Sequence, residues 1–258
     1  MGQILVTGAN GQLGLTLQKQ ADDFPELSFD LKSSRELDIT RFSQINETFR
    51  KEQYDFCINC AAFTNVEEAE KQPAKAFAVN AEGAKNLAEV CKEHRTPLIH
   101  ISTDYVFDGE KENAYTIVDT PNPINEYGKS KLAGEKFIQQ IQPNHYIVRT
   151  SWLYSKKHGH NFYRTILRKA LAGEDLFVTD AQKGCPTNTE ALAKFILKEI
   201  VRGNKPFGLY HFTDGKPMTW YDFAQQILDE NGLTNKVKLV LDANYRTFAK
   251  RPKYSALL

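Results

Sequence analysis

The feature that most constrains this chain is a glycine-rich loop between an apolar run and a segment of helical period. Gly8, Gly11 and Gly14 are spaced three apart in TGANGQLG, directly after the residues ILV. In a strand–turn–helix unit, the first glycine permits a tight turn, the second lets the backbone approach a pyrophosphate, and the third lets the helix pack on the sheet. The helix N-terminus then offers N–H groups to the pyrophosphate. The loop predicts dinucleotide binding; an ordinary glycine-rich turn is the alternative.

Apolar runs alternate with helical segments along the first part of the chain. The runs QILVTG, DFCINCAA, TPLIHIST and HYIVRTSW lack polar alternation, as strands of a parallel sheet do when both faces are covered. Segments with apolar residues at helical spacing lie between them, so right-handed crossovers are expected. The pattern predicts an α/β fold, a Rossmann-type doubly wound parallel sheet.

After Trp152 the pattern changes to helices separated by short extended pieces. We expect a dinucleotide-binding domain over residues 1–150 and a smaller, mainly helical substrate-binding region over residues 151–258, at the carboxyl edge of the sheet. Part of the later sequence, roughly residues 191–213, is expected to return to the first domain.

Composition excludes several classes of protein. The 258 residues carry 33 basic and 32 acidic side chains, so a net charge of +1 favours neither nucleic acid nor a membrane surface. The sequence lacks an apolar run of about 18 residues and enters a strand almost at once, so we expect a cytoplasmic protein. Cys57 and Cys60 share a C-x-x-C spacing. This spacing could indicate redox or metal chemistry. On a buried strand, however, residues three apart point to opposite faces, and the sequence has no second cysteine pair to complete a zinc site. We therefore interpret the two cysteines as part of a buried strand.

The loop after the second predicted strand bears on the choice of cofactor. An acidic residue at the end of that strand would bind a ribose 2′-hydroxyl. Here Asp30 lies inside the apolar run and is followed by basic and hydroxyl side chains, namely Lys32, Ser33, Ser34 and Arg35. Such groups suit a 2′-phosphate, so NADPH is predicted in preference to NADH, which stays possible.

Tyr127 and Lys131 are four residues apart in the helical segment NEYGKSKLAGEK and therefore share one face. A phenol is a weak acid at neutral pH, but a nearby ammonium favours the phenolate. Tyr127 would then protonate a carbonyl oxygen as hydride arrives at carbon. The alternative is a tyrosine beside a lysine on the surface.

A third polar residue follows a different strand. The run PLIHIS leads into TDYVFDG, and the carboxyl ends of parallel strands face the ligand crevice. We expect Thr103 to donate a hydrogen bond to the same carbonyl oxygen, with Asp104 and Tyr105 lining the crevice. A helix or turn cap is the alternative for Thr103.

Together these motifs resemble the extended short-chain dehydrogenase/reductase superfamily. The segments LDIT, NCAAFTNVEEAE, VNAEGAKNLA, STDYVFDG, YGKSKLAGE, VRTSWLY and RPKYSALL are, more narrowly, similar to the dTDP-4-dehydrorhamnose reductase family. The resemblance spans nearly the whole chain. It implies NAD(P)H-dependent reduction of the C4 ketone of dTDP-4-dehydro-L-rhamnose to dTDP-L-rhamnose, a step in nucleotide-sugar and surface polysaccharide biosynthesis.

The resemblance also implies a set of site residues. The catalytic residues are Thr103, Tyr127 and Lys131. Substrate contacts are implied for Thr103, Asp104, Tyr105 and Trp152, with the Trp152 ring stacked on the sugar or, alternatively, packed in the core. The implied cofactor contacts are Gly8, Asn10, Gly11, Gln12, Leu13, Gly14, Asp38, Ile39, Ala61, Ala62, Thr64, Tyr127 and Lys131.

Some positions depart from the family pattern. Ala181 replaces an aspartate, Tyr254 replaces an asparagine, and the sequence stops directly after RPKYSALL. Leu15 and Thr16 stand where some members carry a magnesium-binding carboxylate, so no metal is expected. Two alternatives stay open: another nucleotide-sugar reductase or epimerase of the superfamily, and a non-catalytic regulatory subunit resembling the methionine adenosyltransferase β subunit. A monomer or a homodimer is expected.

Overall fold

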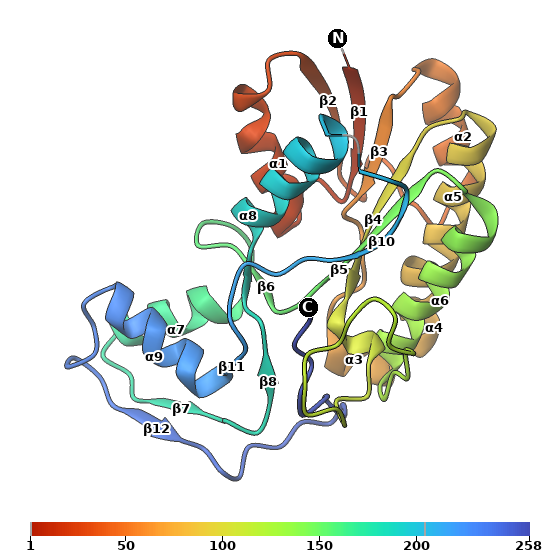
Figure 1. Cartoon of the computed structure of the whole chain (residues 1–258). Helices are drawn as coiled ribbons and strands as arrows, with labels where there is room; N and C mark the ends of the chain where they lie inside the picture. Colours follow the sequence, from red (N-terminus) through yellow and green to blue (C-terminus); the bar gives the residue numbers. More distant parts are fainter. Residues whose placement is uncertain (1, 204) are drawn as a thin grey trace.

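The computed structural model describes residues 2–203 and 205–258. Its centre is a six-stranded sheet in the order β10-β5-β4-β3-β1-β2, in which all neighbouring strands are parallel (Figure 1). The predicted Rossmann-type α/β fold is confirmed. The strands are β1 (Gly2–Thr7), β2 (Leu27–Lys32), β3 (Phe56–Asn59), β4 (Leu98–Thr103), β5 (His145–Thr150) and β10 (Gly208–His211).

Helices cover both faces of this sheet (Figure 1). Alternation along β1 explains its unbroken apolar run, because Leu5 packs with one helical layer and Ile4 and Val6 with the other. One layer contains α2 (Phe42–Lys51), α5 (Gly83–Glu93) and α6 (Glu126–Ile141). The other contains α1 (Gln12–Gln20) and α8 (Thr189–Lys194), which continues as the π-helical η4 (Phe195–Val201).

Short helical segments connect these elements. The helical segment that begins at Pro73 contains a π-helical stretch, so α4 (Pro73–Phe77) and α5 are joined by η2 (Ala78–Glu82). The remaining short segments are η1 (Ala21–Asp23), α3 (Val66–Lys71) and η3 (Asp104–Val106).

A smaller region lies beside the sheet, where α7 and α9 run close together (Figure 1). Its own core contains Tyr163, Ile166, Phe223 and Ile227. The chain leaves this region to form β10 of the central sheet and then returns to it. The division into domains at residues 1–150 and 151–258 stays a prediction. The elements are β6 (Leu153–Tyr154), α7 (Phe162–Leu171), β7 (Leu176–Val178), β8 (Lys183–Gly184), β9 (Thr187–Asn188), β11 (Met218–Thr219), α9 (Trp220–Glu230) and β12 (Leu239–Leu241).

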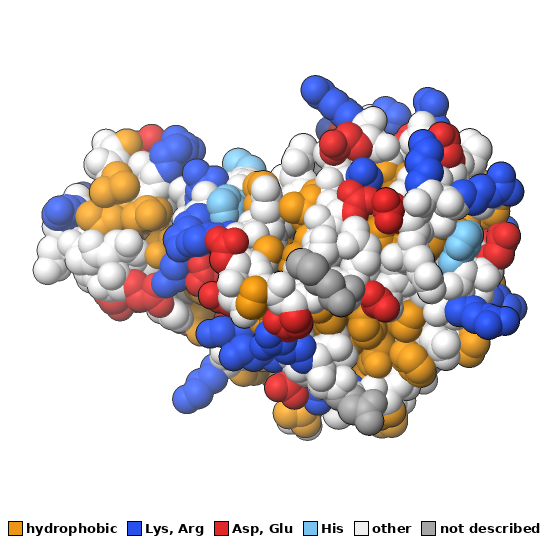
Figure 2. Space-filling model, turned by 90° about the horizontal axis from the view of Figure 1, so that it is seen from above, with side chains coloured by type: hydrophobic (Ala, Val, Ile, Leu, Met, Phe, Trp, Pro, Cys, Tyr) orange, Lys and Arg blue, Asp and Glu red, His pale blue; other side chains and the backbone are white. Residues whose placement is uncertain are grey.

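The surface agrees with the balanced composition. Figure 2 shows acidic and basic side chains intermixed over the face seen from above. Among the described residues, no helix is both long and apolar enough to cross a membrane.

Candidate active site

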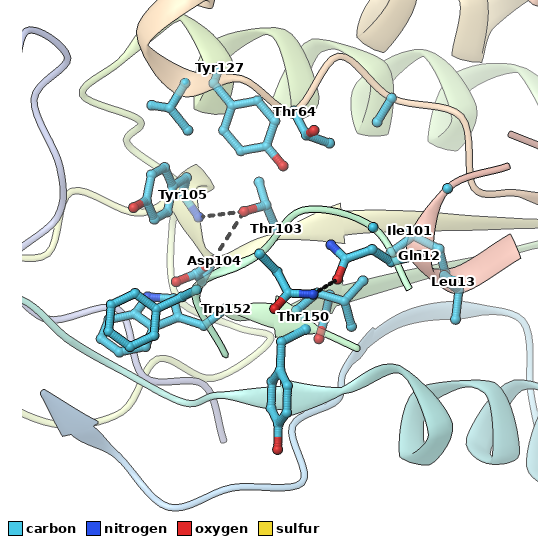
Figure 3. Close-up of a pocket in the computed structure, with 18 of the residues that line it drawn as sticks. Gln12, Leu13, Thr64, Ile101, Thr103, Asp104, Tyr105, Tyr127, Thr150 and Trp152 are labelled. Atoms are coloured by element: carbon cyan, nitrogen blue, oxygen red, sulfur yellow. Dashed lines mark hydrogen bonds between the residues drawn. The ribbon is translucent and has the colours of Figure 1, made fainter. Parts of the chain in front are cut away.

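A cavity of about 550 Å³ lies where the carboxyl ends of the central strands meet the smaller region. The strand order reverses between β1 and β3, the place where open α/β sheets bind ligands. Figure 3 shows Tyr127, Thr103, Asp104 and Trp152 around this cavity. The predicted site residues that line it are Asn10, Gly11, Gln12, Leu13, Ala62, Thr64, Thr103, Asp104, Tyr105, Tyr127, Lys131 and Trp152. Other predicted cofactor residues are not among those lining it, namely Gly8, Gly14, Asp38, Ile39 and Ala61.

The glycine loop has the geometry of a phosphate cradle. Gly8 has a φ of 68°, and a Cβ there would lie 2.5 Å from the Ala61 backbone nitrogen. A Cβ at Gly14 would lie 2.5 Å from the Ala9 carbonyl oxygen, so glycine allows α1 to pack on the loop. Within the described residues, α1 has neither a side-chain cap at Gly11 nor an acidic residue in its first turn. These free N–H donors fit a pyrophosphate.

Gln12 joins the glycine loop to the smaller region. Its Oε1 atom accepts hydrogen bonds from the Ser155 backbone N–H at 2.9 Å and from Asn161 Nδ2 at 2.7 Å. Gly159 packs so closely on Gln12 that a Cβ at Gly159 would lie 2.5 Å from its Cγ. The side chain of this predicted cofactor residue therefore connects the two sides of the cavity.

The end of β2 and the loop after it contain the residues predicted to determine whether NADPH or NADH is preferred. Lys32 Nζ lies 2.9 Å from Asp30, and the Ser33 N–H and hydroxyl both donate to Glu36 Oε2, at 2.8 and 2.6 Å. Arg35 is exposed. Of the predicted phosphate-binding groups, Lys32 and Ser33 already have acidic partners.

Helix α6 places Tyr127 and Lys131 at the cavity. The helix begins at its N-cap Asn125, whose side chain accepts from the Gly128 N–H at 2.7 Å. A Cβ at Gly128 would lie 2.0 Å from the Tyr105 carbonyl oxygen, so this glycine lets the first turn approach η3. Tyr127 meets Tyr105 edge to face at 5.9 Å, and its hydroxyl points toward Thr103 (Figure 3).

The ionisation of this pair differs from the prediction. We expected the Lys131 ammonium to lower the pKa of Tyr127. Instead, burial raises the pKa of Tyr127 to about 12, while hydrogen bonding with the Thr103 side chain lowers it and the charge of Asp104 raises it further. Lys131 Nζ donates to the Ile101 carbonyl at 2.6 Å and lies 3.1 Å from His100 Nε2. Burial lowers the pKa of Lys131 to about 8.

Asp104 is the centre of a buried cluster of hydroxyl groups. Its Oδ2 atom accepts from Ser151 at 2.9 Å and from Ser255 at 2.5 Å, and its Oδ1 atom accepts from Thr103 at 3.1 Å. Burial raises the pKa of Asp104 to about 6, although these hydroxyls lower it. Because the Thr103 hydroxyl also accepts from the Tyr105 N–H, its proton points to Asp104 (Figure 3). Donation to a substrate carbonyl, as predicted, requires this hydroxyl to rotate.

Trp152 is held by a second tryptophan. The rings of Trp152 and Trp220 stack at a centroid distance of 3.4 Å with an interplanar angle of 2°. Trp152 has a φ of 47°, and a Cβ at Gly184 would lie 2.5 Å from its ring. Trp220 in turn donates from Nε1 to Gln182 at 3.0 Å. One face of the indole that was predicted to stack on a sugar is thus covered by Trp220.

Sequence reasoning missed most of the smaller region's contribution. Its aromatic side chains come from the starts of α7 and α9 and from the short strand β6. For the residues of α7 and α9, helical periodicity predicts only a place in the core. The unpredicted lining residues of this region include Tyr154, Asn161, Phe162, Trp220 and Phe223. Among the described residues no cluster of three metal-ligating side chains is found, and the expected lack of a metal stays a prediction.

The fold and the cavity define a class of protein. A parallel sheet with a glycine loop at its switch point, and a Tyr127–Lys131 helix beside Thr103, make this chain an extended short-chain dehydrogenase/reductase. The family model described as the RmlD substrate binding domain matches residues 2–258.

Individual relatives narrow this class. A dTDP-4-dehydrorhamnose reductase of Aggregatibacter actinomycetemcomitans is 38% identical over 100% of this chain and 90% of its own length. The enzyme of that name from Escherichia coli K12 is 38% identical, over 98% and 88% of the two chains. A crystal structure of the Bacillus anthracis dTDP-4-dehydrorhamnose reductase in complex with NADP superimposes with a TM-score of 0.95 at 36% identity, covering 100% and 91%. The chain belongs to the dTDP-4-dehydrorhamnose reductase family.

Proposed function

We propose that this protein reduces the C4 ketone of dTDP-4-dehydro-L-rhamnose to dTDP-L-rhamnose with NADPH, in nucleotide-sugar and surface polysaccharide biosynthesis. The observation that carries this proposal is the convergence of Thr103, Tyr127 and Lys131 on one cavity with the glycine loop. The relatives from Aggregatibacter actinomycetemcomitans and Escherichia coli, which match along the whole chain, bear the name of this reductase. NADH is the alternative donor.

The chain's own groups divide the work of the reaction. The free N–H donors of α1 and the turn at Gly8 hold the pyrophosphate of the cofactor. When bound, the nicotinamide supplies a hydride to C4. Tyr127, which burial keeps protonated at neutral pH, delivers the proton of its hydroxyl to the ketone oxygen. The Thr103 hydroxyl donates a hydrogen bond to the same ketone oxygen. Lys131, as a cation, stabilises the phenolate that Tyr127 becomes.

The preference for NADPH rests on two kinds of support. The Bacillus anthracis relative is described in complex with NADP. In this chain Lys32 ends β2 and Arg35 lies in the loop that follows, where a 2′-phosphate is expected, although the Ser33 hydroxyl already donates to Glu36.

The two alternatives make different demands on the site. An epimerase keeps its cofactor through turnover, whereas a reductase must release it. A regulatory subunit has no use for a buried tyrosine that points at a threonine across a cavity, so Tyr127 favours catalysis. The dTDP-sugar substrate, the cytoplasmic location and a monomeric or homodimeric state complete the proposal.

A substrate panel tests the function. NADPH and NADH oxidation should be measured with a set of dTDP-4-keto sugars, followed by identification of the product. We expect turnover to be fastest with dTDP-4-dehydro-L-rhamnose and NADPH. Faster turnover of another 4-keto sugar would support the related reductases instead, and cofactor that stays bound while C4 inverts would indicate an epimerase. Binding without turnover of any sugar would support the regulatory subunit.

A further inference from the structure

A series of buried, hydrogen-bonded polar side chains leads from Lys131 across three strands. These strands, β4, β3 and β1, are neighbours in the sheet (Figure 1). Thr7 Oγ1 lies 2.8 Å from Asn59 Oδ1, and Asn59 Nδ2 lies 3.0 Å from His100 Nδ1. His100 Nε2 then lies 3.1 Å from Lys131 Nζ. Each of these four residues is at most 1% exposed, so their protons must be shared among themselves and the neighbouring backbone.

The orientation of the Asn59 amide is fixed by the backbone. The Ala61 N–H, which can only donate, points at Asn59 Oδ1 at 3.1 Å. The oxygen therefore faces Ala61 and the NH₂ group faces His100, which makes His100 Nδ1 an acceptor. Burial keeps the pKa of His100 well below its usual value, so the ring is neutral. Its single proton is then on Nε2.

This tautomer decides what Lys131 can be. The His100 Nε2–H points at Lys131 Nζ, and an ammonium has no lone pair to accept it. A free amine satisfies both contacts, since it accepts from His100 and donates to the Ile101 carbonyl at 2.6 Å. All four side chains of this hydrogen-bonded series have suitable partners only when Lys131 is uncharged.

We propose that His100, oriented by Asn59, is a positioning residue that stabilises the free amine of Lys131 and so helps to set the pH at which this lysine becomes charged. When Lys131 acts as a cation beside Tyr127, it carries one more proton and gives up its contact with His100. The idea deepens the proposed function, because it assigns a control of charge to a residue outside the catalytic set.

Other charged groups around Lys131 do not replace this control. Glu135, one turn further along α6, is bound by Arg149 at 2.6 Å and by the Ser102 hydroxyl at 2.5 Å. Burial raises the pKa of the Cys60 thiol, so this side chain directly after β3 stays neutral. Tyr127 keeps its proton for the same reason. Glu135 still favours the charged form of Lys131 through space, and burial opposes it.

The test measures the protonation of Lys131 directly. The full chain is labelled with ¹³Cε-lysine, the Lys131 signal is assigned with a Lys131→Met variant, and its titration is followed by NMR with no added cofactor. Asn59→Asp replaces the NH₂ donor by a second acceptor, so His100 can carry its proton on Nδ1 and offer Nε2 to an ammonium. We expect the Lys131 pKa to rise by about one unit, a tenfold gain in proton affinity.

Two controls separate this effect from a charge acting through space. In a His100→Phe background, Asn59→Asp should raise the Lys131 pKa much less, because the relay is missing. Asn86→Asp, which adds a carboxylate on α5, should leave it unchanged. An equal rise with and without His100, or no rise at all, would overturn the proposal.

A second variant keeps the test valid if Asn59→Asp does not fold. His100→Gln can turn its amide oxygen toward Lys131 and should also raise the Lys131 pKa; a value equal to wild type would again overturn the proposal. The titration needs neither substrate nor turnover, so its result does not depend on whether the proposed reaction is correct. Where turnover is measurable, the alkaline limb of kcat/KM should move to higher pH in the same variants.

Discussion

Replacing Asp104 by asparagine should change how the stability of the fold depends on pH. Burial raises the pKa of Asp104 from 3.8 to about 6 against the pull of three hydroxyl donors. One pKa unit corresponds to about 1.4 kcal/mol, so the ionised carboxylate costs the fold about 3 kcal/mol well above its folded pKa. This cost is absent below the unfolded pKa and grows as pH rises through both values. Near pH 5 about half of it is present.

Asp104→Asn removes this ionisation and keeps the size of the side chain. The substitution also changes the hydrogen bonds of this side chain. The resulting change in the free energy of unfolding is the same at both pH values, so it cancels when the difference between variant and wild type is compared at those two values. From about pH 5 to about pH 8, the wild type should lose about 1.5 kcal/mol of stability relative to Asp104→Asn. Urea unfolding at both pH values measures this, with Asp22→Asn at an exposed position of η1 as the control. A difference that stays constant, or that changes in the opposite direction, would refute a raised pKa at Asp104.

Three further predictions concern the walls of the cavity. Trp220→Ala should remove the stack on Trp152 and cost about 1 kcal/mol in kcat/KM for the nucleotide sugar, with cofactor binding unchanged. Because the chain has two tryptophans, the emission of Trp152 alone then reports loss of the stack. Gln12→Ala removes the acceptor of the buried Ser155 N–H, while Asn161 Nδ2 keeps the carbonyls of Ser155 and His158. The variant should lower the free energy of unfolding by about 1–3 kcal/mol in urea titrations, and an unchanged free energy of unfolding would contradict the bridging role of Gln12. Arg35→Ala should weaken NADPH by about 1 kcal/mol at low salt and leave NADH unchanged, and equal losses in dissociation constants would contradict a 2′-phosphate contact.

The fold could be predicted because local pattern determines it. In β1, apolar residues on both sides of the strand require cover on both faces, and the residues Leu5 and Val6 find it in different helical layers. The convergence of Thr103 and Tyr127 was also accessible, since a residue at the carboxyl end of a parallel strand must face the crevice.

The state of the site could not be predicted because it depends on contacts between distant segments. Ser255 reaches Asp104 across 151 positions, and Asn59 reaches His100 across 41. Spacing placed Lys131 on the face of Tyr127, but only side-chain packing shows that its nitrogen bonds to Ile101 and His100. The stack of Trp220 on Trp152 likewise follows from how α9 docks, which no periodicity encodes.

The central claim is that hydride reaches C4 of the sugar while Tyr127 protonates the oxygen. The direct measurement uses NADPH deuterated at the transferable position, dTDP-4-dehydro-L-rhamnose, and mass spectrometry and NMR of the product. The account predicts dTDP-L-rhamnose with one deuterium at C4, formed ~10²–10⁴-fold more slowly by Tyr127→Phe and at the wild-type rate by Tyr221→Phe, which lies outside the cavity. Product without deuterium at C4, or a Tyr127→Phe variant as fast as wild type, would contradict it.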